Sequence, residues 1–524
     1  MRKRSIMSRQ TAMDRLWRYR EWVVLAIYMA LTLWFSTFYI PWEDEVQAWL
    51  IARDCNLWEI VGMMRYEGHF LPWVLILVPF AKTGFSMWAM KPISIFFMSV
   101  FVFLFLKRAP FPFWPKVLFV FGLPCAFLYP IVSRCYSLVP LAVICLCITY
   151  KERYAKPMPY MLSLLFLFNT HVMMLVFVAI IFCDYLYGLY RKEGAVADRG
   201  KAIRAVIVFM VLAFLSIAPM FGCLGTNENV VRQLSYPFTK RLATSFEKFF
   251  ELLFFVWVDF LMESPFLSKL FFGVLSLSTF AFVVIVCLCD AYVGKRVLLS
   301  TAVYWSFLGG FVYDCANSRQ KSALLFFVFL YYFWVCREHV AGIAEDVFYR
   351  MGKGLLCLFL VAGVLSLSIF VPKLMCDDSS VLLMADYMNR NLDDRSIVFT
   401  VENPHPYVNI IAHTDGRIRF FDIMRQRFYT YCVWDNPDPS RLFSEKDLGF
   451  LEYDFASVSA DKFYFLNAVP SDRPYAERKV LDRLFAEGVL VEVASYADGF
   501  YPMSYCLYRV DMDGFRKLYG KNRK

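Results

Sequence analysis

The chain has 524 residues, of which 59% are hydrophobic and 19% aromatic, and its formal net charge is +10. This composition is too apolar for an ordinary soluble globular protein, and its uncharged stretches approach the length that crosses about 30 Å of hydrocarbon. It predicts an all-α, polytopic membrane protein in contact with lipid. Basic residues gather before the first apolar stretch, which excludes a nucleic-acid-binding patch there and gives no reason to expect a nucleic-acid partner.

Apolar stretches divide the first 372 residues into predicted spans joined by polar loops. We predict spans at 22–41, 88–106, 113–130, 135–149, 158–170, 171–188, 203–221, 267–290, 297–314, 322–337 and 354–372. Two further apolar stretches, 70–84 and 246–262, are counted as not crossing, although a crossing there would move the loops that follow to the other side. The expected total is about 11–13 transmembrane helices, according to how these two stretches are assigned.

Lysine and arginine residues set the predicted orientation. Seven of them precede the first span, and others fall in alternate loops, at 107–108, 151–156, 191–201 and 295–296. Since cytoplasmic loops carry an excess of these residues, the amino terminus is predicted to be cytoplasmic. An odd number of spans then places the segment after residue 372 outside. The expected location is a bacterial inner membrane, with a multi-pass chain and a periplasmic C-terminal domain.

After Pro372 the composition becomes that of a soluble domain, residues 373–524. Amphipathic patterns predict helices at 379–391 and 473–487, and apolar runs predict strands at 396–401, 463–466 and 506–510. About 150 residues are enough for one small α/β domain. The expected fold is thus a transmembrane domain over 1–372 followed by this external domain.

The external loop 41–70 carries an acidic motif. Glu43, Asp44 and Glu45 follow the first span directly, and ionisable groups at a bilayer edge are candidates for function because they are costly to desolvate. The spacing of the apolar residues predicts an interfacial helix over 43–58 that holds these acids over a cavity between the spans. Two other acids of the loop are expected to form structural ion pairs, Asp54 with Arg53 and Glu67 with Arg65.

The predicted topology puts a small set of polar residues at the external ends of the spans. A carboxylate can act as general base toward an acceptor hydroxyl, so the cluster of Glu43, Asp44 and Glu45 supplies the catalytic candidates. Cationic groups can hold a phosphate leaving group, and the candidates for binding a donor phosphate are Arg134, Arg319, Lys321 and His69. The candidates for substrate contact are Glu43, Tyr136, Asn169 and His171. Each set also has a plainer interpretation as a solvated loop, as lipid-anchoring side chains or as ordinary interfacial histidines.

Short motifs surround these candidates, beginning with WEDEVQAWLIARD at 42–54. It resembles the first external loop of GT-C fold glycosyltransferases, in particular bacterial relatives of protein O-mannosyltransferases and of the aminoarabinose lipid A transferase. The match points to Asp44 as the catalytic carboxylate and Glu45 as its companion. Further segments are similar to family motifs: 65–72 to a stretch ending in His-Pro-Pro-Leu, 133–138 to Ala-Arg-x-Tyr-Ala-Leu and 168–172 to Asn-Thr-His-Val. At 318–322 only Arg319 carries over from the family's Arg-His-x-Gly, because Gln320 replaces the histidine.

The resemblance implies an enzyme that moves a sugar, with inversion, from a polyprenyl-phosphate carrier to a glycan, lipid or protein acceptor on the external face. Carboxylate oxygens can also ligate a divalent cation, although the sequence does not require one. The sequence leaves the sugar and the acceptor open. Two other interpretations remain: a transporter, flippase or polysaccharide polymerase of the cell envelope, and a non-catalytic envelope assembly protein. Against transport, no inverted repeat is apparent in the sequence.

Overall fold

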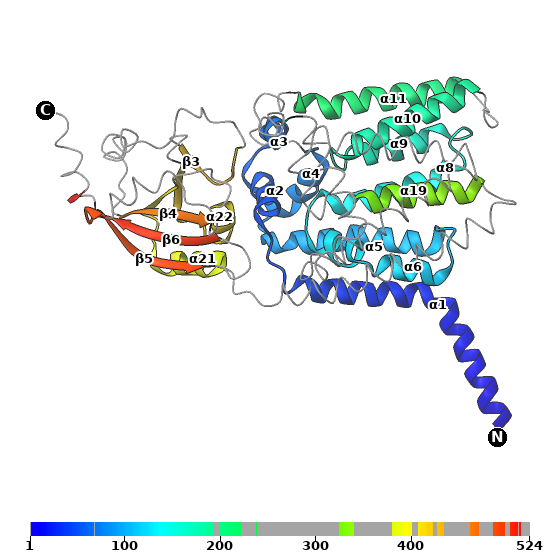
Figure 1. Ribbon diagram of the computed structural model, residues 1–524, viewed down its shortest axis with the longest axis horizontal. Coiled ribbons are helices and arrows are strands. Elements are labelled where there is room, and N and C mark those ends of the chain that lie inside the picture. The colour runs from blue at the N-terminus through cyan, green and yellow to red at the C-terminus, as the bar shows by residue number, and fades with distance from the viewer. Residues whose placement is uncertain are drawn as a thin grey trace.

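The computed structural model describes residues 2–67, 69–191, 199–221, 237, 324–339, 380–400, 407–422, 427–433, 462–470, 486–497, 503–511 and 513–514. Within these ranges a bundle of helices lies at one end of the molecule and a sheet with its helices lies at the other (Figure 1). The mainly helical part and the C-terminal sheet expected from the sequence are both present. The stretches at 246–262, 267–290, 297–314 and 354–372, residues 473–485 of the predicted helix 473–487, and the domain boundary expected at residue 372 lie outside the described residues.

The helices of the bundle are largely apolar. They are α1 (Arg2–Ser36), α5 (Met90–Arg108), α6 (Phe113–Val120), α7 (Tyr129–Ile131), α8 (Leu138–Tyr150), α9 (Pro157–Phe168), α10 (Met174–Arg191), α11 (Arg199–Ile217) and α19 (Leu324–His339). Within the described part of the chain, three stretches are long and apolar enough to cross a membrane, namely Met87–Arg108, Met174–Arg191 and Arg199–Met220. These stretches agree with a membrane location. The total of about 11–13 spans stays a prediction.

The predicted span 113–130 is bent. After α6 the chain passes through a π-helical turn, η2 (Pro124–Leu128), into α7, and the two halves meet at 50°. Pro124 has no N–H to donate, which interrupts the regular helical hydrogen bonds. The hydroxyl of Tyr28 in α1 donates a 2.7 Å hydrogen bond to the backbone oxygen of Cys125 inside this bend. Both residues are buried, so the bond satisfies a carbonyl that water does not reach and fastens the bend to α1.

Helix α5 connects the two ends of the bundle. At its start Trp88, in the short helix η1 (Met87–Ala89), lies against His413 of the C-terminal part, with 5.9 Å between the ring centroids. At its other end Lys107 forms a 3.3 Å ion pair with Glu21 of α1. Because the 19 residues of α5 rise by about 1.5 Å each, the helix is roughly 28 Å long, close to the thickness of a bilayer core. The amino terminus and the C-terminal part therefore lie at opposite ends of the bundle (Figure 1).

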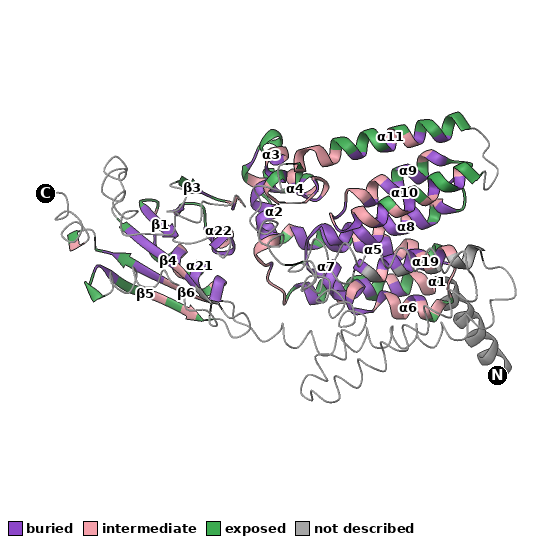
Figure 2. Cartoon of the chain, turned by 45° about the horizontal axis from the view of Figure 1, so that its top comes forward, coloured by how far each residue is buried: buried purple, intermediate pink, exposed green. Residues whose placement is uncertain are grey.

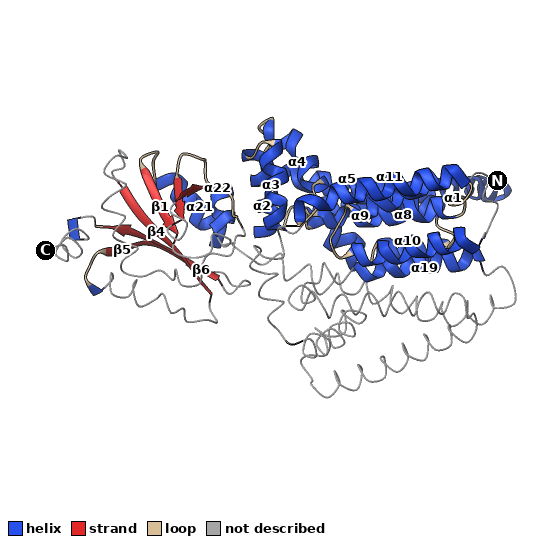
Figure 3. Cartoon of the chain, turned by 90° about the horizontal axis from the view of Figure 1, so that it is seen from above, coloured by secondary structure: helices blue, strands red, loops and turns tan. Residues whose placement is uncertain are grey.

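Three short helices lie at the end of the bundle that faces the sheet: α2 (Glu43–Asp54), α3 (Leu57–Glu67) and α4 (Pro72–Lys82) (Figure 1 and Figure 3). The prediction of one helix over 43–58 is wrong, since Cys55 is extended and ends α2. The Asn56 side chain then accepts hydrogen bonds from the N–H groups of Trp58 and Glu59, as is typical of a residue that caps the start of a helix. Leu57, at the start of α3, is exposed.

Helix α2 packs on α4, which occupies the apolar stretch 70–84 and has only 11 residues, with Pro79 in its interior. The buried residues of α2 include two polar ones, Glu45 and Gln47. The expected ion pair of Arg53 with Asp54 is confirmed, at 2.7 Å. In contrast to α2, α11 is exposed along much of its length (Figure 2) and its exposed side chains are mostly apolar, which suits contact with lipid.

The described strands form one six-stranded sheet in the order β3-β2-β1-β4-β6-β5. They are β1 (Ser396–Thr400), β2 (Arg419–Asp422), β3 (Arg427–Tyr429), β4 (Lys462–Pro470), β5 (Leu490–Ala497) and β6 (Met503–Val510). β1 pairs in parallel with β2 and β4, so that Val398 lies opposite Phe420 and Tyr464, and the other pairs are antiparallel. Alternate strand residues form a core with α21 (Ser380–Asn391) and α22 (Val408–His413). The predicted helix at 379–391 and the three predicted strands are confirmed.

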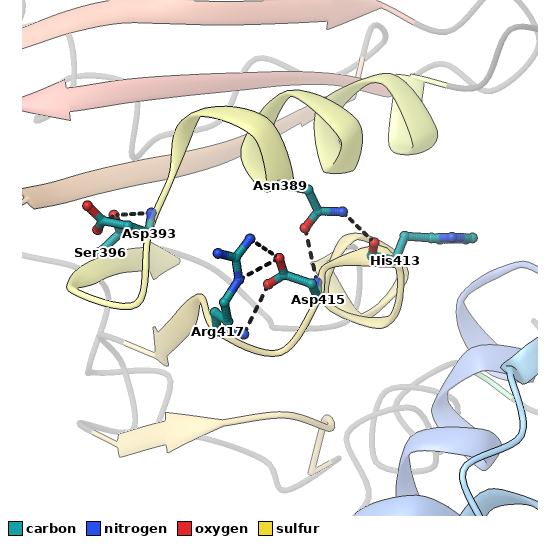
Figure 4. Close-up of polar contacts among 6 residues, drawn as sticks. All are labelled: Asn389, Asp393, Ser396, His413, Asp415 and Arg417. Atoms are coloured by element: carbon teal, nitrogen blue, oxygen red, sulfur yellow. Dashed lines mark hydrogen bonds and ion pairs between the residues drawn. The ribbon is translucent and has the colours of Figure 1, made fainter.

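The loop after α22 orients His413. The Asn389 carboxamide donates to the backbone oxygen of His413 and accepts from the N–H of Asp415, both at 3.0 Å. Asp415 also pairs with Arg417, and Gly416 between them has φ 79°, a left-handed conformation that suits glycine. The imidazole of His413 points away from these contacts (Figure 4). Burial lowers the pKa of His413 to about 4, so the ring that packs toward the bundle is neutral.

We expect Tyr28→Phe to destabilise the protein, because the substitution leaves the buried carbonyl of Cys125 without the hydroxyl that it accepts from. A buried polar group that loses its partner costs about 1–3 kcal/mol. The measurement is thermal unfolding of the purified protein in one detergent, where the variant should unfold at a lower temperature. Tyr19→Phe, at an exposed position of the same helix, is the matched control. Equal midpoints for the two variants would contradict this role of Tyr28.

Candidate functional site

The three acidic residues form the first turn of α2. Carboxylates are favourable there, since the first N–H groups of a helix carry partial positive charge. Consecutive helical residues point about 100° apart, so Asp44 and Glu45 reach different partners. Asp44 contacts a loop that lies far along the chain, whereas Glu45 turns into the protein.

Glu45 is fully buried and three hydrogen-bond donors contact its carboxylate. They are the hydroxyl of Tyr39 (2.6 Å), the N–H of Trp42 (3.0 Å) and the N–H of Ser133. Burial raises the pKa of Glu45 to about 7, although the hydrogen bonds and the nearby Arg134 favour the ionised form. Because Ser133 directly precedes Arg134, this carboxylate fixes the backbone that presents the arginine.

Arg134 joins the acidic motif to His69. One terminal nitrogen of its guanidinium forms an ion pair with the Asp44 carboxylate, and the other lies 2.8 Å from Nε2 of His69. Burial acts to lower the pKa of Arg134, but the charge of Asp44 outweighs it and holds the pKa above its ordinary value. The side chain of Arg134 is 9% exposed and that of Asp44 25%, so the carboxylate is the more accessible partner. The arrangement is a buried, permanent cation whose carboxylate partner still reaches solvent.

Hydrogen bonds define the neutral tautomers of His69 and His171. A guanidinium can only donate, so Nε2 of His69 accepts from Arg134 and the ring proton of the neutral form is on Nδ1. His171 lies just before α10, and its Nδ1 accepts from the N–H of Met173 at 3.1 Å, which leaves the proton on Nε2. Protonating His69 would place a second cation against Arg134. Each ring therefore suits the role of an uncharged hydrogen-bond donor.

A row of aromatic rings continues from these histidines into the bundle. The ring centroids of His69 and His171 are 5.3 Å apart, and His171 stacks on Tyr136 at 4.9 Å. Tyr136 stacks on Tyr129 at 5.7 Å, and Tyr129 stacks on Phe327 of α19 at 5.3 Å. Parallel rings at these distances pack favourably. The row holds Tyr136 and His171 in place, and the Arg134 guanidinium lies 5.8 Å from the centroid of the Tyr136 ring.

The described residues contain one group with the composition of a metal site, His69, Cys135 and His171, whose ligand atoms lie within 4.8 Å of one another. Zinc binds such ligands through a nitrogen lone pair of each ring. Here one nitrogen of each ring already accepts a hydrogen bond, so a bound cation would break the bonds to Arg134 and Met173 and lie close to a guanidinium. Both carboxylate oxygens of Glu45 already accept hydrogen bonds, from the Tyr39 hydroxyl and from the N–H of Ser133. The two rings as oriented here suit hydrogen bonding better than metal binding.

The remaining predicted site residues are Glu43, Asn169, Arg319 and Lys321. Glu43 begins α2 and is half-buried beside Asp44. Asn169 ends α9, where its carboxamide donates to the backbone oxygen of Leu165 at 3.0 Å, a contact that caps the helix. Arg319 and Lys321 lie outside the described residues, and their role stays a prediction.

Two residues near the site were not among the predictions, Gln47 and Cys135. Gln47 lies one helical turn after Asp44, and its carboxamide donates to Glu67 at 2.8 Å. The expected pairing of Glu67 with Arg65 stays a prediction. A lone polar side chain in an otherwise apolar helical stretch was the available signal. Cys135 gave no such signal, since cysteines among apolar residues behave as small hydrophobes.

No model of a known protein family matches the chain, and no curated protein sequence matches it either. The contacts of Asp44, Arg134 and His69 and the motif resemblance are therefore the observations that bear on function. Those contacts bring together segments that are 90 and 65 positions apart in the sequence.

Proposed function

We propose that the chain is an integral membrane glycosyltransferase with a GT-C-like transmembrane domain. It moves a sugar from a polyprenyl-phosphate carrier to an acceptor on the external face, with inversion. The observation that supports this most directly is the double contact of Arg134 with Asp44 and His69. This contact joins a candidate base, a permanent cation and a neutral imidazole. They lie at the end of the bundle where α5 begins, and a lipid-linked phosphate would lie at the same level.

In the proposed reaction the acceptor hydroxyl attacks the anomeric carbon from the side opposite the phosphate. The carbon–oxygen bond to the phosphate breaks, and its electron pair leaves with the polyprenyl phosphate. Asp44 takes the proton of the acceptor. Arg134 stabilises the charge that grows on the phosphate oxygens, and Arg319 and Lys321 are the further candidates for that role. Tyr136 and His171 are buried, so in this proposal they support His69 and Arg134 from behind.

The ion pair suggests an order for these events. In the absence of donor, Arg134 and Asp44 neutralise each other. A phosphate competes for the guanidinium, because charge-assisted bonds between guanidinium and phosphate are strong and often bidentate. Donor binding would then release the Asp44 carboxylate to accept a proton from the acceptor. In this order Asp44 becomes available as a base only after Arg134 has bound the phosphate of the donor.

Orientation and location complete the proposal. The amino terminus and the C-terminal part lie at opposite ends of the bundle (Figure 1), which supports a cytoplasmic amino terminus and a periplasmic C-terminal domain.

The decisive experiment incubates the purified protein in lipid with labelled polyprenyl-phosphate sugars, with and without glycan, lipid or protein acceptors. Sugar transfer or donor cleavage supports the enzyme. Movement of donor across the bilayer without bond cleavage supports a transporter or flippase.

Asp44→Asn is expected to lower kcat about 10²–10⁴-fold, the usual contribution of a positioned base. The carboxamide keeps the size of the side chain and a hydrogen bond to Arg134 but cannot take a proton. Transfer assays and thermal unfolding are measured together, and the unfolding temperature should change little. Asp54→Asn, on the same helix, is the control, because Asp54 pairs with Arg53 at an exposed position. Near-normal kcat in Asp44→Asn would remove Asp44 as the base.

Arg134→Lys should weaken use of the donor. Lysine keeps the charge but lacks the planar fork that contacts Asp44 and His69 together. We expect kcat/KM for the donor to fall about tenfold or more, equivalent to about 1.4 kcal/mol of transition-state binding. Arg53→Lys, which alters an exposed ion pair of the same loop, should keep normal donor kinetics. Unchanged kinetics in Arg134→Lys would assign this arginine to lipid anchoring.

Activity should depend on pH through Glu45. Since burial raises its pKa to about 7, the side chain becomes protonated as the pH falls through neutrality. A protonated carboxyl has one oxygen that must donate, while the N–H groups of Trp42 and Ser133 both need acceptors, so the backbone before Arg134 loosens. We expect kcat/KM of the unmodified protein to fall on the acid side with an apparent pKa near 7.

The variant Glu45→Gln should lose this acid limb and have low activity at every pH, because a carboxamide offers one acceptor oxygen in place of two. Glu59→Gln, at an exposed position of α3, should keep the limb. A profile of the unmodified protein that is flat between about pH 6 and about pH 8 would exclude this dependence on Glu45.

A further inference from the structure

Gln47 links the C-terminal part to the helices that carry the site. Its side-chain nitrogen donates to the backbone oxygen of Cys432 at 2.6 Å, and its side-chain oxygen accepts from the N–H of the same residue at 2.9 Å. The nitrogen also donates to the carboxylate of Glu67 at 2.8 Å. Gln47 is 1% exposed, so these contacts are sheltered from water.

The three contacts determine how the carboxamide is oriented. Turning it over would place its oxygen against the Cys432 carbonyl and the Glu67 carboxylate, and its nitrogen against the Cys432 N–H. All three bonds would be lost in a buried position, where an unsatisfied polar group is costly. The backbone at Cys432 therefore fixes the orientation of Gln47, and Gln47 in turn fixes the carboxylate of Glu67.

Both segments that Gln47 touches also carry the site. Glu67 ends α3 two residues before His69, whose ring accepts from Arg134. Gln47 itself lies one turn after Asp44 on α2, the other partner of Arg134. A shift at Cys432 thus reaches Arg134 from two sides, through α2 and through the end of α3.

We propose that the C-terminal domain positions the candidate active site, and that Gln47 is the positioning residue. Cys432 holds Gln47, Gln47 holds Glu67, and the chain from Glu67 then presents His69 to Arg134. The inference rests on the proposed function for its kinetic test. Its structural test is independent of any activity.

Other contacts hold the two parts together without this carboxamide. Val408 of α22 is fully buried in a cluster with apolar residues of α2 and α4. The hydroxyl of Tyr431 also contacts the thiol of Cys55, the residue that ends α2. Because apolar docking and the polar contacts use different side chains, substitutions can weaken one and keep the other.

The test compares Gln47→Met with Val408→Ala in the full-length protein. Methionine has nearly the shape of glutamine but forms none of the three hydrogen bonds, whereas Val408→Ala weakens apolar docking alone. For Gln47→Met we expect kcat/KM for the polyprenyl-phosphate donor to fall about tenfold or more, with a higher KM. Partial unfolding would lower the apparent kcat and leave KM unchanged. Val408→Ala should unfold at a lower temperature and keep the donor KM.

Hydrogen exchange supplies the structural readout. The backbone amides of His69 and Phe70 should exchange faster in Gln47→Met than in the unmodified protein, and Val408→Ala should leave them unchanged. This holds whether or not the protein transfers sugar, so a failure of the proposed function is distinguishable from a failure of this inference. If Gln47→Met kept the donor KM and the His69 and Phe70 exchange rates of the unmodified protein, the positioning role would be overturned.

Reversing the polar pair gives a second check. Gln47→Glu alone sets one carboxylate against another and should raise both the donor KM and the exchange at His69. Adding Glu67→Gln restores a donor–acceptor contact between positions 47 and 67 and should recover part of both effects. No recovery in the double variant would show that the contact with Glu67 does not transmit the position of Cys432.

Discussion

The carboxylate of Glu45 has no access to solvent, so its hydrogen bonds must come from the protein. They come from three places: the segment after α1 through Tyr39, the start of α2 through Trp42, and the loop before Arg134 through Ser133. Each donor would be costly to leave unsatisfied, and together they tie segments that lie 88 positions apart. The site therefore depends on a side chain that does not need to touch substrate at all.

Much of the fold follows from local pattern. Long apolar runs predict α5, α10 and α11, and short apolar runs predict the central strands β1 and β4. The break between α2 and α3 was missed for a local reason: the apolar spacing runs on past Cys55, but Asn56 caps a new helix and interrupts it. The bend at Pro124 was missed in the same way, within a run that is apolar throughout.

The sequence indicates which residues belong to the candidate site better than it indicates how they pair. Adjacent carboxylates at a membrane edge and an arginine among apolar residues draw notice in a single sequence, since both are costly unless they have partners. The pairing of Asp44 with Arg134 and the inward turn of Glu45 depend on packing between distant segments, and so does the hydrogen bond from Gln47 to Glu67. The row of rings from His171 to Phe327 is of the same kind, because it joins four elements that no local pattern relates.

The contact between Gln47 and Cys432 spans 385 positions of the chain. During biosynthesis the helices of the bundle emerge long before the residue that fixes this carboxamide. Asp44 and Arg134 are therefore synthesised well before the residue whose backbone holds Gln47. A chain released before Cys432 was made would lack the contact that orients Gln47. The contact forms only when the C-terminal part of the chain has folded.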